Sequence, residues 1–317
     1  MKIFVTGGAG FIGSHIVDYL IGRGDDVVIY DNFCTGQEIF IKHHFDNQRF
    51  TLIKDDVLNF NALKKAMKDS DFVFHIAGHA DVRGGYTDHD IDLKQNFMAT
   101  QNVLEAMHQL NIKNIAFSST SSVYGDAILH PTPESYPFEP TSLYGAAKAN
   151  SENYIYTYAH YYDWNAYIFR FVSWIGERYT HGCIFDFMKK LKADSSHLYM
   201  LSDGTPKKSS LYVKDGVNAI FTIIEKSSEK INIYNLGHEE VTTIKNIADI
   251  VCDELGLKKV QYTFEGGDKG WMGDNKFVHL SIDKLKQLGW EPTVNIEEGI
   301  RRTVRYLKES SFLLNAR

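Results

Sequence analysis

Two side chains four residues apart join a phenol to an ammonium group. Residues 144–148 read Tyr-Gly-Ala-Ala-Lys and begin a predicted helix. Positions i and i+4 share one helical face, so that the ammonium of Lys148 lies near the phenol of Tyr144. Tyrosine has a reference pKa of about 10, and a neighbouring ammonium favours its phenolate form. The pair is therefore suited to removing a proton from a hydroxyl group.

A run of hydroxyl side chains precedes this helix. Ser118, Ser119 and Thr120 lie at the end of a predicted strand over 115–118. The hydroxyl of Thr120 can share a substrate hydroxyl with Tyr144 and relay its proton. Taken alone, such a cluster is more often a solvated turn. A Tyr-x-x-x-Lys spacing also arises by chance in a chain with 18 tyrosines, so the catalytic interpretation needs support from elsewhere in the chain.

That support comes from a glycine-rich turn near the start of the chain. Gly7, Gly10 and Gly13 follow a predicted strand over 2–6 and open a predicted helix over 12–21. Glycines at this spacing allow a tight turn, close approach of the backbone to a pyrophosphate, and close packing of helix on strand. The helix N-terminus then stabilises the phosphate charge. The pattern predicts a dinucleotide site.

Asp31 closes the second predicted strand, 18 residues after Gly13. A carboxylate at this point can accept hydrogen bonds from both ribose hydroxyls of an adenosine, and it repels a 2′-phosphate. The sequence therefore favours NAD over NADP as the cofactor. The alternative is that Asp31 only caps a turn with Asn32.

The elements that position these residues alternate along the first half of the chain. Continuous apolar strands between helices indicate a parallel sheet covered on both faces. With right-handed crossovers, such a sheet forms a Rossmann-type, doubly wound α/β fold. The second half predicts a smaller α/β substrate-binding domain. The expected domains are 1–180, which binds NAD, and 181–317, which forms a cap interleaved with the first. The predicted strands are 2–6, 27–30, 50–53, 72–77, 115–118 and 167–172, and the predicted helices are 12–21, 61–68, 92–110, 143–161, 184–191, 215–225, 243–255 and 297–307.

The composition of the 317 residues limits the function classes. With 44% hydrophobic and 23% charged residues, the chain has the composition of a globular protein. Its formal net charge of −6 argues against a nucleic-acid polymer as a partner. The three cysteines lie far apart and form no CxxC spacing. We therefore expect neither a disulfide framework nor a structural zinc site, and a cytoplasmic location.

Membrane and metal partners are also not expected. Met1 and Lys2 lead directly into a predicted strand, which predicts no secretory signal, and no apolar run approaches the roughly 18 residues of a membrane span. His75 and His79 are four residues apart but lack the glutamate of an HExxH site. His43 and His44 are expected to face solvent.

Taken in order, the sequence motifs resemble those of an extended short-chain dehydrogenase/reductase. The chain is most similar to the UDP-glucose 4-epimerase-like branch of the nucleoside-diphosphate-sugar epimerase/dehydratase family. The resemblance covers essentially the whole length. It rests on TGGAGFIGSH at 6–15, YDN at 30–32, DDV at 55–57, HIAGHADV at 75–82, SSTSSVYG at 118–125, YGAAK at 144–148, RFVSWIG at 170–176, LSDGTPKKSSLYVKD at 201–215 and GWMGD at 270–274.

The resemblance implies a role for each matching residue. Tyr144, Lys148 and Thr120 inherit the catalytic roles, in which a bound NAD takes a hydride from a sugar carbon while the tyrosine removes the hydroxyl proton. Lys148 also holds the nicotinamide ribose. Asn96 inherits a role in holding the active-site helix or a water, and the alternative is that it is only a helix cap. The implied cofactor contacts are Gly7, Gly10, Phe11, Ile12, Asp31, Asn32, Asp56, Val57, Ile76, Ala77, Gly78, Ser118, Tyr144 and Lys148.

The residues after Thr120 bear on the outcome of the reaction. The family's 4,6-dehydratases carry Asp-Glu at these positions, where this chain has Ser121 and Ser122, so dehydration is disfavoured. The resemblance implies C4 oxidation of a nucleoside-diphosphate sugar, followed either by epimerisation or by release of the 4-keto sugar as a C4 dehydrogenase. A dinucleotide sensor without turnover is a third alternative, which retention of the Tyr–Lys pair disfavours.

Departures from the family pattern lie on the substrate side. Ser173 replaces an asparagine, Lys208 replaces an arginine, and a second arginine position holds Trp271. Lysine lacks the bidentate geometry of arginine on a diphosphate. The substrate contacts that we expect are Thr120, Ser121, Ser173, Lys208 and Lys269, and a different base or a larger sugar such as a heptose stays open. The resemblance further implies a role in polysaccharide biosynthesis and a homodimer whose four-helix bundle is formed by segments 92–110 and 143–161.

Overall fold

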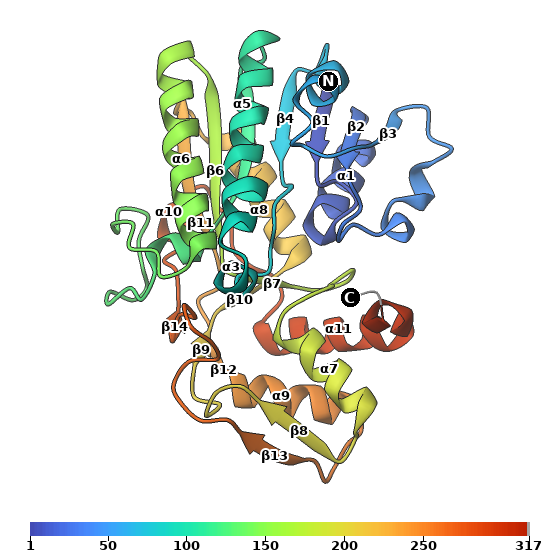
Figure 1. The fold of residues 1–317 in the computed structure, drawn as a ribbon, viewed down its shortest axis with the longest axis vertical. Helices are drawn as coiled ribbons and strands as arrows, with labels where there is room; N and C mark the ends of the chain where they lie inside the picture. Colours follow the sequence, from blue (N-terminus) through green and yellow to red (C-terminus); the bar gives the residue numbers. More distant parts are fainter. Residues whose placement is uncertain (316–317) are drawn as a thin grey trace.

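A computed structural model describes residues 1–315 and contains a large parallel sheet (Figure 1). Its strand order is β11-β6-β5-β4-β1-β2-β3, and every neighbouring pair is parallel. The strand order therefore turns back beside β1, as in a doubly wound fold. The strands are β1 (Lys2–Thr6), β2 (Asp26–Asp31), β3 (Phe50–Lys54), β4 (Phe72–His75), β5 (Asn114–Thr120), β6 (Asn165–Phe171) and β11 (Ile231–Leu236).

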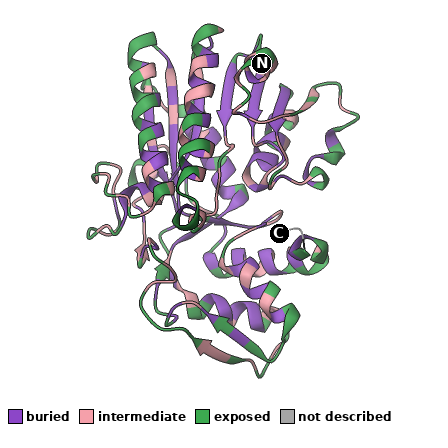
Figure 2. Ribbon diagram, in the orientation of Figure 1, coloured by how far each residue is buried: buried purple, intermediate pink, exposed green. Residues whose placement is uncertain are grey.

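Helices cover both faces of this sheet, which explains why its central strands are apolar without alternation. Along β1, Ile3 and Val5 pack into one buried cluster with α1 (Phe11–Arg23) and α8 (Val213–Lys226). Phe4, which points the other way, packs with a second cluster. That cluster includes α2 (Phe60–Met67), α5 (Ala99–Gln109) and α6 (Leu143–Tyr162). Figure 2 shows these strands as the most continuously buried part of the upper layer.

The cap lies at the carboxyl edge of the sheet, in the lower part of Figure 1. Three helices, α7 (Cys183–Ala193), α9 (Ile244–Glu254) and α11 (Ile296–Glu309), pack against one another. Its strands pair in small sheets. The remaining elements of this half are β7 (Ser173–Ile175), β8 (His197–Met200), β9 (Lys207–Lys208), β10 (Ser210–Tyr212), β12 (Thr242–Thr243), β13 (Gln261–Phe264), β14 (Phe277–Val278), α10 (Asp283–Lys286) and the short helix η5 (Ser311–Asn315).

The predicted fold class, a Rossmann-type sheet with a smaller α/β part, is confirmed. Strand β11 and helix α8 come after residue 180 but belong to the large sheet layer. We propose a domain division at residue 180. In this division β11 and α8 belong to the second segment but pack with the first, so the two segments are interleaved. Among residues 1–315, no helix is long and apolar enough to cross a membrane.

The structure changes one predicted helix. The segment 92–110 is helical from Asp92 to Gln109 but not α-helical throughout. It begins at the last residue of α4 (His89–Asp92), widens in the π-helical η3 (Leu93–Met98) and continues as α5, and α3 (Gly84–Thr87) lies before α4. The Asn96 carbonyl accepts hydrogen bonds from the hydroxyls of Thr100, at 2.6 Å, and Ser151, at 3.3 Å. These side chains supply the carbonyl with partners where the helix widens, and such a widening often marks a functional site.

Candidate active site

The glycine turn connects β1 to α1 at the carboxyl edge of the sheet. Gly7 has a φ of 71°, and a Cβ there would lie 2.7 Å from the amide nitrogen of Ala77. A Cβ at Gly13 would lie only 2.0 Å from the Gly7 carbonyl oxygen. Gly10 is the N-cap residue of α1, and no side chain caps this end of the helix. The turn thus leaves a close, side-chain-free approach to a helix N-terminus, which fits a dinucleotide pyrophosphate.

Asp31 ends β2 beside this turn, and its side chain is buried. Its Oδ2 accepts a hydrogen bond from the amide of Ala9 at 2.9 Å, and Oδ1 accepts one from Phe33 at 2.8 Å. Burial raises the pKa of Asp31, and the two amide hydrogen bonds partly oppose this rise. Asp31 therefore orders its own turn and also ties it to the glycine turn, where the adenosine ribose of a dinucleotide is expected.

The other predicted cofactor residues gather on the same edge. The Asn32 amide donates to Asp56 Oδ2 at 2.8 Å. The carbonyl of Val57 accepts from Asn102 at 3.1 Å. Ile76, Ala77 and Gly78 follow β4 directly, and the Ala77 amide donates to the hydroxyl of Thr6 at 3.2 Å. These segments are brought together by the neighbouring strands β3, β2, β1 and β4.

The predicted catalytic residues also meet at this edge. Thr120 ends β5, and the short helix η4 (Ser121–Tyr124) follows it. Tyr144 and Lys148 lie in the first turns of α6, whose N-cap Ser142 accepts a hydrogen bond from the Gly145 amide. The ammonium of Lys148 donates to the Ser118 carbonyl at 2.9 Å, and the Thr120 hydroxyl donates to Ser122 Oγ at 3.2 Å. Tyr144, Lys148 and Thr120 all line the same cavity. The three side chains form one constellation.

The protonation of this constellation is set mainly by burial. Loss of solvation raises the pKa of Tyr144 to about 12, while the nearby Thr120 hydroxyl opposes the rise. Burial lowers the pKa of Lys148 to about 8, and the nearby carboxylates Asp92 and Glu152 oppose that fall. The chain alone therefore holds Tyr144 as a phenol, and a positive charge brought by a ligand would favour the phenolate.

Beneath the site lies a buried polar network that the sequence did not predict. The Arg170 guanidinium of β6 pairs with Glu152 of α6 at 2.7 Å, and both side chains are nearly inaccessible to solvent. Ser119 donates to the same carboxylate, and Arg170 also donates to the Tyr124 hydroxyl at 2.7 Å. The network fixes the end of β5 against α6. It thereby sets the position of Thr120 relative to Tyr144.

The constellation opens into a cavity of about 590 Å³ between the sheet and the cap. This volume lies within the range of ordinary small-ligand sites. Ser121 and Ser122 line it beside the catalytic residues, and from the cap come residues such as Trp271 and Phe187. A ligand that reaches from the glycine turn past Tyr144 would therefore extend into the cap.

The predicted substrate residues are distributed unevenly around this cavity. Thr120, Ser121, Ser173 and Lys208 are part of its lining. Lys208 pairs with Asp274 at 2.9 Å, so its charge is already compensated. Lys269 is not among the residues that line the cavity and pairs with Asp126. The role of each as a substrate contact stays a prediction.

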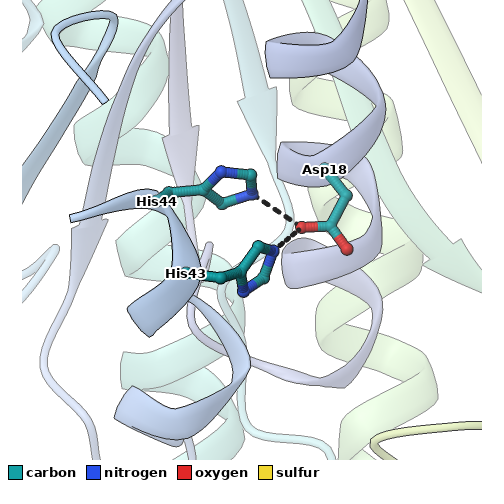
Figure 3. Close-up of side chains that lie close together, drawn as sticks. All are labelled: Asp18, His43 and His44. Carbon is teal, nitrogen blue, oxygen red and sulfur yellow. Dashed lines mark hydrogen bonds and ion pairs between the residues drawn. The ribbon is translucent and has the colours of Figure 1, made fainter. Parts of the chain in front are cut away.

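Outside the cavity, Asp18, His43 and His44 lie close together, and their side chains are of types that can bind a metal ion (Figure 3). The Nε2 atoms of His43 and His44 lie 2.9 Å and 2.7 Å from Asp18 Oδ1, and Arg178 pairs with the other oxygen at 2.7 Å. Both carboxylate oxygens are thus engaged, so hydrogen bonds and ion pairs account for the cluster. The expectation that both histidines face solvent is wrong for His44, which is buried because it packs in η2 (Lys42–His44) against α1.

The two histidines of the 75–79 spacing also have protein partners. His75 is fully buried between the hydroxyls of Thr6, at 2.8 Å, and Thr100, at 3.0 Å. Burial, with a smaller contribution from Lys148, lowers the pKa of His75 to about 3. His75 is therefore a neutral core residue, whereas His79 pairs with Asp92 beside the cavity.

Known proteins resemble this chain in sequence and fold over nearly its whole length. A Methanocaldococcus jannaschii protein named for UDP-glucose 4-epimerase activity is 33% identical over 315 residues, covering 98% of this chain and 99% of its own length. A crystal structure of a UDP-galactose 4-epimerase superposes with a TM-score of 0.88 at 35% identity, covering 98% and 99% of the two chains. A UDP-glucuronic acid 4-epimerase from Bacillus cereus, solved with UDP-glucuronic acid and NAD, gives 0.90 at 28% identity, covering 98% and 100%.

The family model for the NAD dependent epimerase/dehydratase family matches residues 3–237. This range contains the glycine turn, Asp31, Thr120, Tyr144 and Lys148. It is about three quarters of the chain. The protein therefore belongs to the NAD dependent epimerase/dehydratase family, and NAD is its cofactor.

Proposed function

We propose that this protein is an NAD-dependent 4-epimerase of a nucleoside-diphosphate sugar, acting through a 4-keto sugar. The observation that carries the proposal is the meeting of Thr120, Tyr144 and Lys148 in one cavity beside the glycine turn. The relatives named above as 4-epimerases match over nearly the whole chain, which supports the same reaction. A C4 dehydrogenase that releases the 4-keto sugar is the second candidate, since it uses the same residues.

In this mechanism the chain supplies the proton transfer and the positioning. Lys148, held by the Ser118 carbonyl, binds the nicotinamide ribose and stabilises a phenolate at Tyr144. Tyr144 removes the proton of the sugar C4 hydroxyl, and Thr120 shares that hydroxyl. NAD, held at the glycine turn, would supply a positively charged ring that favours the phenolate and the capacity to accept a hydride.

Epimerisation requires the 4-keto sugar to rotate in the site, so that the hydride returns to the opposite face of C4. The roomy cavity between sheet and cap supports this step, because the ring must rotate without leaving the enzyme. Ser121 and Ser122 occupy the wall next to Thr120, and neither can act as the acid or the base that water elimination would need. This argues for epimerisation or dehydrogenation over dehydration.

The substrate test uses the purified protein with UDP-glucose, UDP-galactose and UDP-glucuronic acid, and with GDP-, CDP- and dTDP-sugars. Absorbance of reduced nicotinamide and NMR of the products are followed together. An inverted C4 centre with no lasting absorbance is the expected result. A stable 4-keto product with accumulated NADH would establish the dehydrogenase instead. No reaction with any sugar would overturn both and favour a dinucleotide sensor.

We further propose that the protein acts as a homodimer in the cytoplasm, in polysaccharide biosynthesis. Supporting the dimer, the outer surface of η3 and α6 carries exposed Met98 and Tyr154, and the Tyr154 ring packs edge-on against Phe97 at 4.8 Å. Light scattering should give twice the chain mass, and Met98→Glu with Tyr154→Glu should give a monomer. A monomeric wild-type protein would contradict the dimer.

A further inference from the structure

Behind the catalytic pair lies a buried polar cluster that the proposed mechanism does not use. Asp92 ends α4 with no solvent exposure, and Asn96 in η3 is almost as buried. Asp92 Oδ1 accepts hydrogen bonds from the Asn96 amide at 2.8 Å and pairs with His79 Nδ1 at 3.1 Å. Asp92 Oδ2 and Asn96 Oδ1 are both buried and have no hydrogen-bond partner among residues 1–315. One carboxylate oxygen and one amide oxygen are thus buried without a hydrogen bond.

These acceptors lie next to the catalytic side chains. A Cβ placed on Gly78 would lie 2.6 Å from Asn96 Oδ1 and 3.3 Å from the Lys148 ammonium. A Cβ on Gly85 would lie 2.3 Å from Asp92 Oδ2 and 3.2 Å from the Cβ of Leu143, which precedes Tyr144. The cluster therefore lies beside the start of α6, with Gly78 and Gly85 between its oxygens and the residues of that helix. His79 connects it to the cavity, whose wall it forms in part.

The unpaired oxygen of Asp92 makes no hydrogen bond within the described part of the chain. An uncharged asparagine at position 92 would keep an acceptor for Asn96 and His79 without burying a charge. Burying an unpaired carboxylate oxygen costs stability. Lys148 is a cation that the proposed mechanism needs. Burial favours its uncharged form, and the charge of Asp92 favours the ammonium.

We propose that Asp92 is a positioning residue of the catalytic pair, whose buried negative charge keeps Lys148 an ammonium and sets the pH range of catalysis. This inference rests on the proposed function of Tyr144 and Lys148. His79 moderates the effect, because its hydrogen bond to Oδ1 disperses part of the charge of Asp92. The same charge disfavours the phenolate of Tyr144, so both groups respond to it in the same direction.

Other charged groups around the cluster are compensated or remote. On α6, Glu152 is paired with Arg170, and on β4 the buried His75 is neutral. Asp90, two residues before Asp92, is exposed and pairs with Lys94 at 2.9 Å. Asp88, His89 and Asp81 are solvent-exposed or partly so. Asp92, in contrast, is buried and pairs with the imidazole of His79, which carries no permanent positive charge.

The test compares the pH dependence of NAD reduction in Asp92→Asn and in Asp90→Asn, which removes an exposed charge from the same segment. The probe is the sugar nucleotide that reacts in the substrate test. In Asp92→Asn, both limbs of the pH profile should move to lower pH by about one unit, because the pKa values of Lys148 and Tyr144 both fall. Asp90→Asn should leave both limbs in place. A lower rate with unmoved limbs in Asp92→Asn would show a merely structural role and overturn the inference.

A second variant tests the sign of the effect. His79→Leu removes a donor from Asp92, so the carboxylate charge is less dispersed and both limbs should move to higher pH. A movement to lower pH, or none, would contradict the inference even if Asp92→Asn failed to fold. Tyr144→Phe separates the two proposals: if it still reduces NAD, the proposed function fails, whereas an inactive Tyr144→Phe beside unmoved limbs leaves that function standing.

Discussion

Gly13 determines how closely α1 lies against the glycine turn, and replacing it tests the cofactor site. A Cβ at position 13 would lie 2.0 Å from the Gly7 carbonyl oxygen and 2.9 Å from its carbon. Carbon and oxygen atoms that are not bonded approach to about 3.3 Å. The turn must therefore open by about 1 Å to accept the methyl group of Gly13→Ala.

The cost of that opening falls on cofactor binding. Adding a methyl group where there is no room costs about 1–3 kcal/mol. Because the displaced peptide belongs to the turn that faces the pyrophosphate, we expect the affinity for NAD to fall about 5- to 150-fold, the equivalent of that cost. Calorimetric titration of nucleotide-free protein with NAD measures it.

Gly22→Ala is the matched control on the same helix. A Cβ at Gly22 meets no atom within 4 Å, and alanine in a helix is about 1 kcal/mol more favourable than glycine. This variant should melt at a higher temperature and bind NAD as the wild type does. If Gly13→Ala bound NAD within twofold of the wild type, the turn would not be the pyrophosphate site and the reasoning would be refuted.

Three further predictions concern the cofactor preference and the two ion-pair networks. Asp31→Ser removes the charge that repels a 2′-phosphate, so the ratio of NAD to NADP affinity should fall by about tenfold or more in calorimetric titrations; an unchanged ratio would rule out this role. Glu152→Gln leaves Arg170 buried without a counter-charge and should lower the free energy of unfolding in urea by about 3–5 kcal/mol, and a loss below about 1 kcal/mol would contradict this. Burial raises the pKa of Asp18, but Arg178 and the two histidines outweigh it and hold the pKa below its usual value. The stability that Asp18 contributes is therefore present above about pH 4 and lost as the pH falls through its folded pKa. Melting curves of Asp18→Asn should show a weaker dependence on pH in that acid range, and an undiminished dependence would count against the ion pair.

Much of the fold followed from the sequence because buried parallel strands are continuous apolar runs. The first strand, Lys2–Thr6, has the predicted bounds, and α6 extends one residue beyond its predicted end. The π-helical stretch within 92–110 was not predictable from periodicity. There the hydroxyls of Thr100 and Ser151 donate to the Asn96 carbonyl, and Ser151 is 55 residues away in the sequence.

The candidate site was predictable where its residues carry local spacing. The glycine turn and the Tyr144–Lys148 pair each lie within one short segment, and the structure brings both to one edge of the sheet. The pairing of Asp92 with His79, and of Glu152 with Arg170, joins residues 13 and 18 positions apart without a sequence motif. Lys208 illustrates the limit on the substrate side, since its pairing with Asp274 across 66 residues changes how much charge it can offer a ligand.

The most direct test of the proposed catalysis is NAD reduction by Tyr144→Phe. This variant keeps the ring, removes the hydroxyl and leaves the glycine turn intact, so it should retain bound NAD. With the sugar nucleotide that reacts in the substrate test, we expect the rate at which reduced nicotinamide appears to fall by about 10²–10⁴-fold, the contribution of a positioned base. A rate within a few-fold of the wild type, with NAD bound, would contradict the assignment of Tyr144 as the catalytic base.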